Sequence, residues 1–253
     1  MRDFSIDHRW LSINTATVRA QWPLDRIVTE CAQRGIRAIS PWRDHVAALL
    51  RDTGMELSGY CRGGMFPAST DAGLLAALDD NRRAVDEAKT LNAACLVLVV
   101  GATLEYARGV GMPLAIEPLH PMYAADRACI NTLEQAPDLC DALDRSRAGA
   151  LGVAVDLYHV WWDPKLQAQI ERAGRERLLA FHVCDWLVPT RDLLNDRGMM
   201  GDGVIDIPRI RGWVEAAGFA GYSEVEIFSA EDWWRRSGGE VLDACIARHR
   251  SAV

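Results

Sequence analysis

Residues 151–186 read LGVAVDLYHVWWDPKLQAQIERAGRERLLAFHVCDW, two short apolar runs separated by a longer amphipathic stretch. The runs Gly152–Asp156 and Leu179–Val183 are rich in Val, Leu and Ala without alternation, as strands buried on both faces should be. Between them, Asp163 and Pro164 supply a cap and a proline for the start of a helix. The stretch therefore predicts a strand, a helix and a second strand, the repeating unit of a parallel sheet.

The same alternation continues along the whole chain. Thr132 with Gln135 has the pattern of a capping box, and Asp206 followed by Ile-Pro marks another helix start. We expect eight strands, at Leu11–Asn14, Ile36–Ser40, Glu56–Cys61, Cys95–Val100, Leu114–Glu117, Gly152–Asp156, Leu179–Val183 and Ser223–Ile227. Eight strands alternating with helices predict an α/β fold, a single (β/α)8 barrel that spans residues 1–253.

The composition limits the partners of the protein. Hydrophobic residues make up 49% of the chain and charged residues 25%, as in an ordinary globular protein, and the net charge of −7 disfavours a nucleic-acid partner. The longest apolar stretch, Ala93–Val100, is too short to span a membrane, and the N-terminus has no apolar signal region. Seven scattered cysteines without a CxxC pair are expected to be reduced and mostly buried, which predicts a cytoplasmic protein.

One βα unit does not fit the pattern well. Only 13 residues separate Val100 from Leu114, which is close to the minimum for a parallel crossover. Either this unit is truncated, or residues of its loop are absent from the sequence. The segment LEYARGVGMP (104–113) has the pattern of the end of a longer helix, which favours the second interpretation.

Four late strands end in ionisable groups, at the end of a barrel where catalytic residues gather. These groups are Glu117, Asp156, His182 and Glu226. Three buried carboxylates close together repel one another, and a divalent cation supplies the opposing charge. Three carboxylates and one imidazole suit Mn²⁺, which we prefer, and also Mg²⁺, Co²⁺ or Zn²⁺.

Two alternatives to this metal site stay open. The four groups can be separate strand-end residues that each pair with an arginine. Glu224 is a rival to Glu226, because alternation along the strand places both on the same face. We choose Glu226 because it lies nearer the C-terminal end of the strand.

Further polar residues are expected around the cluster, and we assign four of them to substrate binding: His159, Asp185, Arg191 and His120. Asp185 is also a candidate to orient His182 or His159. Arg197 follows Arg191 on the same loop. The side chains of Trp161, Trp162, Trp233 and Trp234 either form the wall of a sugar pocket or pack in the core. We expect His8, His45 and His249 at the surface.

Several segments of the second half resemble a known family. They are IEPLHP, INTLEQA, VAVDLYHVWWD, AFHVCDW, GDGVIDIPRI and EVEIFSAEDWW. They resemble the xylose-isomerase-like barrel proteins known as sugar phosphate isomerases/epimerases, and among these they look most like inosose isomerases. The resemblance is specific from about Leu114 to His249. It implies that Glu117, Asp156, His182 and Glu226 bind a metal and that His159 contacts the substrate.

The expected reaction is a metal-dependent isomerisation or epimerisation of a keto-sugar or keto-cyclitol. In this hypothesis one of Glu117 and Glu226 removes a proton next to the carbonyl and the other returns one, through an enediolate. We read the substrate as unphosphorylated, because Asp202 would repel a phosphate at Gly201-Asp202-Gly203.

Other functions stay open or are disfavoured. A lyase acting on a keto-sugar or a dehydroshikimate-like substrate uses the same metal and base, and a non-catalytic sugar-binding barrel is a further alternative. The six histidines are too few for a type IV apurinic endonuclease, and the only lysines, Lys89 and Lys165, lie outside the strands, which disfavours Schiff-base chemistry. Exposed tryptophans are compatible with a homo-oligomer.

Overall fold

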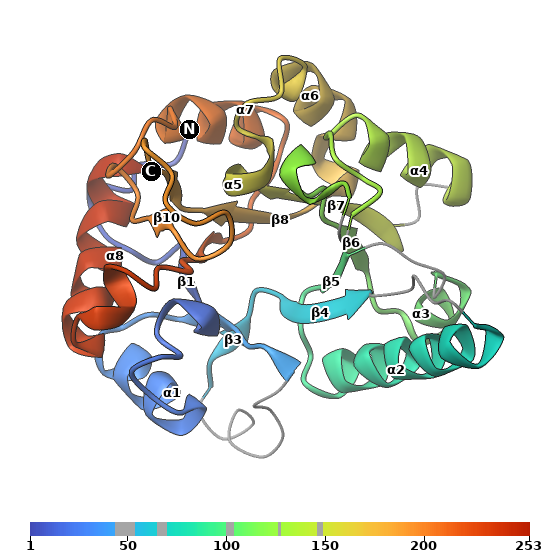
Figure 1. The fold of residues 1–253 in the computed structure, drawn as a ribbon, viewed down its shortest axis with the longest axis horizontal. Coiled ribbons are helices and arrows are strands. Elements are labelled where there is room, and N and C mark those ends of the chain that lie inside the picture. The colour runs from blue at the N-terminus through green and yellow to red at the C-terminus, as the bar shows by residue number, and fades with distance from the viewer. Residues whose placement is uncertain (44–53, 65–69, 100–103, 126–127, 146–148) are drawn as a thin grey trace.

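The computed structural model describes residues 1–43, 54–64, 70–99, 104–125, 128–145 and 149–253. Their main sheet is one nearly closed parallel barrel with helices around its outside (Figure 1), which confirms the predicted (β/α)8 fold. The strands are β1 (Leu11–Asn14), β2 (Ala38–Ser40), β3 (Glu56–Leu57), β4 (Tyr60–Gly64), β5 (Leu96–Val99), β6 (Leu114–Ile116), β7 (Leu151–Asp156), β8 (Leu178–Val183), β9 (Asp185–Trp186), β10 (Arg197–Gly198) and β11 (Ser223–Val225). The helices are α1 (Leu24–Gln33), α2 (Asp71–Thr90), α3 (Leu104–Val110), α4 (Gln135–Leu143), α5 (Leu157–Val160), α6 (Leu166–Arg177), α7 (Ile207–Ala216) and α8 (Gly238–Ala252).

The two edges of the sheet meet where the third predicted strand is divided. β3 and β4 are the two halves of this strand, and they form opposite edges in the order β3-β2-β1-β11-β8-β7-β6-β5-β4. The barrel closes between β4 and the segment that follows β2: a parallel bridge pairs Trp42 with Cys61, and the Cys61 N–H donates to the Pro41 carbonyl at 3.1 Å. The division includes Gly59, where a side chain would be crowded, because a Cβ there would lie 3.2 Å from Ser40 Oγ.

Local sequence signals set the starts of the late helices. The Thr132 N–H donates to Gln135 Oε1 at 3.1 Å and the Gln135 N–H donates to Thr132 Oγ1 at 3.4 Å, which is the reciprocal capping box predicted before α4. The carboxylate of Asp206 accepts from the Arg209 N–H at 3.3 Å and caps α7. α6 begins only at Leu166, because the carboxylate of Asp163 accepts from the N–H two residues further on and caps a preceding turn.

The βα unit between β5 and β6 contains a short helix, and the cysteines are free and mostly buried, as expected. α3 covers only Leu104–Val110, and residues 100–103 lie outside the described part of the chain. The seven cysteines are all described, all free, and buried except for Cys129. Among the described helices, none combines the length and the apolar composition needed to cross a membrane.

The expected surface position of His249 is wrong. Its side chain is fully buried, and its ring stacks on Phe4 with 4.4 Å between the ring centroids. Neither ring nitrogen has a hydrogen-bond partner among the described residues. Burial lowers the pKa of His249 to about 3, assisted by the nearby positive charges of His8 and Arg211. The expected surface position of His45 lies outside the described residues.

Replacing His249 with phenylalanine is expected to reduce the acid sensitivity of the fold. The pKa is about 3 in the folded protein and about 6.5 in an unfolded chain, so the unfolded state alone gains a proton as the pH falls below 6.5. At pH 5 this linkage lowers the free energy of unfolding by about 2 kcal/mol relative to pH 8. Phenylalanine keeps the stacked ring and cannot titrate. Urea unfolding at pH 8 and pH 5 should show a drop in the free energy of unfolding that is about 2 kcal/mol smaller in the variant than in the wild type. An equal drop in both proteins would contradict the buried, neutral histidine.

Candidate metal centre

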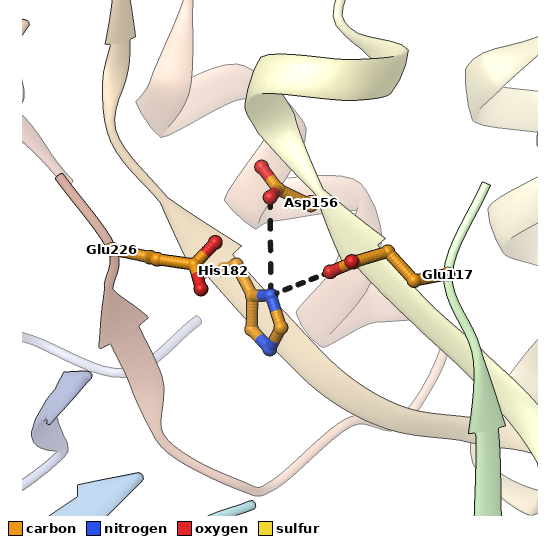
Figure 2. Close-up of side chains that lie close together, drawn as sticks. All are labelled: Glu117, Asp156, His182 and Glu226. Carbon is orange, nitrogen blue, oxygen red and sulfur yellow. Dashed lines mark ion pairs between the residues drawn. The ribbon is translucent and has the colours of Figure 1, made fainter. Parts of the chain in front are cut away.

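Four side chains converge at the C-terminal ends of neighbouring strands (Figure 2). Asp156 ends β7, His182 lies near the end of β8, and Glu117 and Glu226 follow β6 and β11. One ligand atom from each residue lies within 4.8 Å of the others, and all four residues are buried. The parallel register pairs Asp156 with His182, which holds these two side chains level. The structure therefore brings together the four predicted groups, called the metal cluster below.

The metal cluster contains buried polar atoms that lie close together without forming a hydrogen bond. His182 Nδ1 lies 3.0 Å from Glu117 Oε1 and 4.0 Å from Asp156 Oδ2. Neither His182 Nδ1 nor Glu117 Oε1 has a hydrogen bond to any described residue. A buried polar atom without a partner is costly, and a cation bound between these atoms would satisfy them together. Three carboxylates and an imidazole nitrogen are a donor set that suits a divalent transition metal, so the residues present fit such an ion.

The pKa shifts of the clustered side chains also indicate a site that needs positive charge. Burial would raise the pKa of Asp156, but the charges of Arg197 and the neighbouring histidines hold it at about 2. Burial raises the pKa of Glu226 to about 8, although Arg197 and His182 oppose the shift. Burial acts to lower the pKa of His182, but the carboxylates, Glu224 first, raise it well above its usual value. These opposing shifts arise because several buried carboxylates share one small space, and a divalent cation would supply the positive charge that they need.

Arg197 is the basic residue that contacts the metal cluster, although the sequence analysis assigned Arg191 to substrate binding. The Arg197 guanidinium donates to Asp156 Oδ2 at 3.1 Å and to Glu226 Oε2 at 2.9 Å. It stacks on Tyr158, 4.5 Å from the ring centroid. Arg191 instead pairs with Asp196, and 49% of its side chain is exposed. The structure therefore does not bring Arg191 to the site.

Of the other predicted residues, His159 is the one that borders the metal cluster. Its Nε2 lies 3.7 Å from Asp156 Oδ2 and 3.4 Å from an Arg197 nitrogen. Its Nδ1 accepts from the His120 N–H at 3.3 Å, so His120 supports His159 through the backbone. The His120 ring stacks on Trp186, with 5.1 Å between the ring centroids. Burial lowers the pKa of His159 to about 4, which keeps the ring neutral at pH 7.

Asp185 organises the loop that follows β8. Its buried carboxylate accepts four backbone N–H groups, those of Trp186, Gly201, Gly203 and Ile205, at 2.9 to 3.0 Å. It makes no hydrogen bond to His182 or His159, so the orienting role considered for it is not the one the geometry supports. The adjacent hairpin of β9 and β10 pairs Asp185 with Gly198 and thereby carries Arg197 back to the barrel mouth. The sequence contains no simple signal for this path of the chain.

A cavity of about 220 Å³ lies over the metal cluster. Its lining includes two members of the cluster, Glu117 and Glu226, together with His159 and Arg197, which contact it. The other lining residues are Arg19, Trp42, Cys61, Arg62, Val97, Leu119, Tyr123, Leu194 and Phe228. The four tryptophans considered for the pocket wall do not line it, and three of them donate to other groups through their indole N–H. A larger hollow of about 530 Å³ opens beside the N-terminal ends of β3 and β5, far from the ionisable cluster.

Comparison with known proteins identifies the family. The profile of the xylose isomerase-like TIM barrel family matches residues 27–243. A search of curated protein sequences gave no significant match. The solved structure of protein SMc04130 from Sinorhizobium meliloti 1021 is 53% identical, with a TM-score of 0.91 over 96% of this chain and 98% of that chain. The chain therefore belongs to the xylose isomerase-like TIM barrel family.

Two more distant structures share the fold. An IOLI protein with a bound zinc atom is 18% identical, with a TM-score of 0.76 over 93% of this chain and 94% of that chain. A D-allulose 3-epimerase from Methylomonas sp. is 16% identical, with a TM-score of 0.68 over 89% of this chain and 86% of that chain. At these identities the likeness shows the common barrel and no more.

Proposed function

We propose that this protein is a divalent-metal-dependent isomerase or epimerase of a keto-sugar or keto-cyclitol, acting through an enediolate. The observation that carries the proposal is the metal cluster, whose four ligand atoms lie within 4.8 Å of one another under a small cavity. Membership of the xylose isomerase-like family and the fold shared with a D-allulose 3-epimerase support the same class of reaction.

The two glutamates are the proposed proton carriers. Glu117 and Glu226 approach from opposite sides, with His182 and Asp156 between them (Figure 2). A flat enediolate placed between the two carboxylates would present one face to each. One glutamate would take the proton from the carbon next to the carbonyl, and the other would return a proton. Return to the opposite face gives epimerisation, whereas one carboxylate that carries the proton between neighbouring carbons gives aldose–ketose exchange.

The proposed metal ligands are Glu117, Asp156, His182 and Glu226, with Mn²⁺ as the preferred ion. When bound, the ion would supply Lewis acidity that polarises the carbonyl and lowers the pKa of the adjacent C–H. Arg197 would hold the carboxylates of Asp156 and Glu226 in place and donate to a substrate oxygen. The neutral His159 would hydrogen-bond a substrate hydroxyl, because it lines the same cavity.

Solvent deuterium exchange tests this proposal directly. The protein, loaded with manganese, is incubated with a panel of ketoses and keto-cyclitols in deuterated water, and the products are analysed by NMR and mass spectrometry. A proton removed by a carboxylate exchanges with solvent, so we expect deuterium at the carbon next to the carbonyl. A broad panel without any exchange would count against proton abstraction.

The same assay separates two alternatives from isomerisation. A lyase would expel a β-hydroxyl group from the enolate, and the conjugated enone it forms would add a new ultraviolet absorbance. A sugar-binding barrel would bind a ketose without deuterium exchange.

The seven free cysteines are in keeping with the proposed cytoplasmic location.

A further inference from the structure

A fourth buried carboxylate, that of Glu224, lies next to the metal cluster. Glu224 lies on β11, two residues before Glu226, which directly follows this strand, so both side chains face the barrel interior. Its register partner on β8 is His182, and only 2% of the Glu224 surface is exposed. Burying a carboxylate in a barrel core is costly unless it makes compensating interactions, so its partners indicate what it does.

The hydrogen-bond donors to Glu224 are neutral. Asn14 Nδ2 donates to Oε1 at 2.8 Å, and Ser58 Oγ donates to Oε2 at 2.9 Å. Ser12 lies behind Ser58, with 2.7 Å between their hydroxyl oxygens. The basic group paired with this carboxylate is His182, whose Nε2 lies 3.7 Å from Glu224 Oε1.

The amide of Asn14 has only one orientation that satisfies its neighbours. Its Oδ1 accepts from the Ala16 N–H at 3.1 Å and from the Trp42 Nε1–H at 2.9 Å. Both of these groups are donors only, so the amide nitrogen must point the other way, toward the carboxylates. It donates there to Glu224 at 2.8 Å and to Glu226 at 2.9 Å. Asn14 thus ties the deeper carboxylate to a member of the metal cluster.

The two nitrogens of His182 face different groups. Nδ1 faces Glu117 and Asp156, whereas Nε2 faces Glu224 and has no hydrogen-bond partner among the described residues. A neutral imidazole can bind a cation through one nitrogen only if its proton is on the other. Approach of Nε2 by less than about 1 Å would place its N–H in hydrogen-bond contact with Glu224.

From this arrangement we infer that Glu224 is a positioning residue: it accepts the Nε2–H of His182 and thereby directs Nδ1 toward the metal. The inference rests on the proposed metal site and adds to it a carboxylate–histidine–metal relay, held in place by Asn14 and Ser58. Glu224 is not itself one of the ligands, because the group whose donor atoms converge contains Glu226 and not Glu224. A carboxylate in such a relay fixes the ring orientation and typically contributes 10- to 100-fold to metal affinity.

Metal affinity is the direct test. Manganese binding to the metal-free protein is measured by isothermal titration calorimetry for the wild type, Glu224→Leu and Glu224→Gln. Leucine removes the acceptor, and we expect binding about 10- to 100-fold weaker. Glutamine keeps an oxygen acceptor at the same place, so most of the affinity should remain. Glu215→Leu is the matched control: its well-buried carboxylate pairs with Arg2 away from the site, and its affinity should equal that of the wild type.

A spectroscopic readout and a milder variant cover the case in which Glu224→Leu does not fold. In ¹⁵N-histidine-labelled, zinc-loaded protein, we expect the proton of His182 on Nε2 in the wild type. In Ser58→Ala, which frees one oxygen of Glu224, that proton should exchange faster with solvent, and manganese binding should weaken by a smaller factor than in the leucine variant.

Each contrary result has a distinct meaning. Wild-type affinity in Glu224→Leu, or a proton on Nδ1 in the zinc-loaded protein, would overturn the relay and leave the proposed metal site standing. Equal losses in Glu224→Gln and Glu224→Leu would also overturn it, because they would make Glu224 a ligand through its charge. A wild-type protein that binds no manganese would overturn both the relay and the proposed function.

Discussion

Replacing Glu226 with glutamine is expected to lower kcat of the proposed isomerisation by about 10³-fold, within the usual range for loss of a general base. Glutamine has the same shape and can still accept from Asn14, which now donates to the carboxylate at 2.9 Å. It cannot accept a proton from carbon, and it is a weaker ligand than a carboxylate. The loss should therefore appear in kcat and in solvent deuterium exchange, with the fold intact by circular dichroism.

The matched control for this variant is Glu231→Gln, on the same side of the barrel. Glu231 is exposed and pairs with Arg235, so wild-type turnover is expected. Calorimetry with manganese on Glu226→Gln then separates loss of metal from loss of the base. Turnover equal to that of the wild type in Glu226→Gln would show that the base has been assigned to the wrong residue.

Removal of the metal has the second large effect. Dialysis against EDTA should reduce activity to background, and added manganese should restore it, because the proposed reaction needs the ion to stabilise the enediolate. Binding to the folded state alone also raises stability, by about 2.7 kcal/mol at a hundred times Kd. For a chain of this size that corresponds to a rise in Tm of roughly 5 to 10 °C.

Asp156→Asn is the variant that connects this stability change to the metal cluster. It removes the charge of one proposed ligand, yet it leaves an oxygen that can still accept from the Tyr158 N–H, as Asp156 Oδ1 now does at 2.8 Å. We expect the manganese-induced rise in Tm to be largely lost, and scanning fluorimetry would measure it. A full rise in this variant, or activity that survives EDTA, would contradict the metal site.

The fold and the convergence of four ionisable groups could be predicted from the sequence because both depend on short-range patterns. An apolar strand followed by an acid or a histidine is visible within a few residues, and the geometry of a parallel barrel brings all such strand ends to one rim. The residue range of β1 agrees with its sequence pattern. The third strand, predicted at Glu56–Cys61, is divided near Gly59 and continues to Gly64.

Apart from His159, the polar residues that contact the cluster could not be predicted in the same way, because pairing between segments distant in sequence brings them there. Arg197 reaches the barrel mouth through the hairpin of β9 and β10, and Asp185 at the start of this hairpin binds the backbone amide of Ile205, 20 residues further along the chain. Asn14 and Glu224 meet because β1 pairs directly with β11, although 210 residues separate them in sequence. His249 faces inward because α8 packs on Phe4 from the other end of the chain.

The way Asp185 secures its loop has a consequence for how new specificities could arise. Its carboxylate accepts hydrogen bonds from four backbone N–H groups, which fix Trp186 and residues 201–205 on either side of a loop that includes the exposed Val188. The exposed part of the loop around Val188 can therefore change in composition while the anchored ends keep Arg197 beside the four converging side chains. Such a division would allow the proposed reaction to be extended to new substrates while the proposed catalytic residues stay in place.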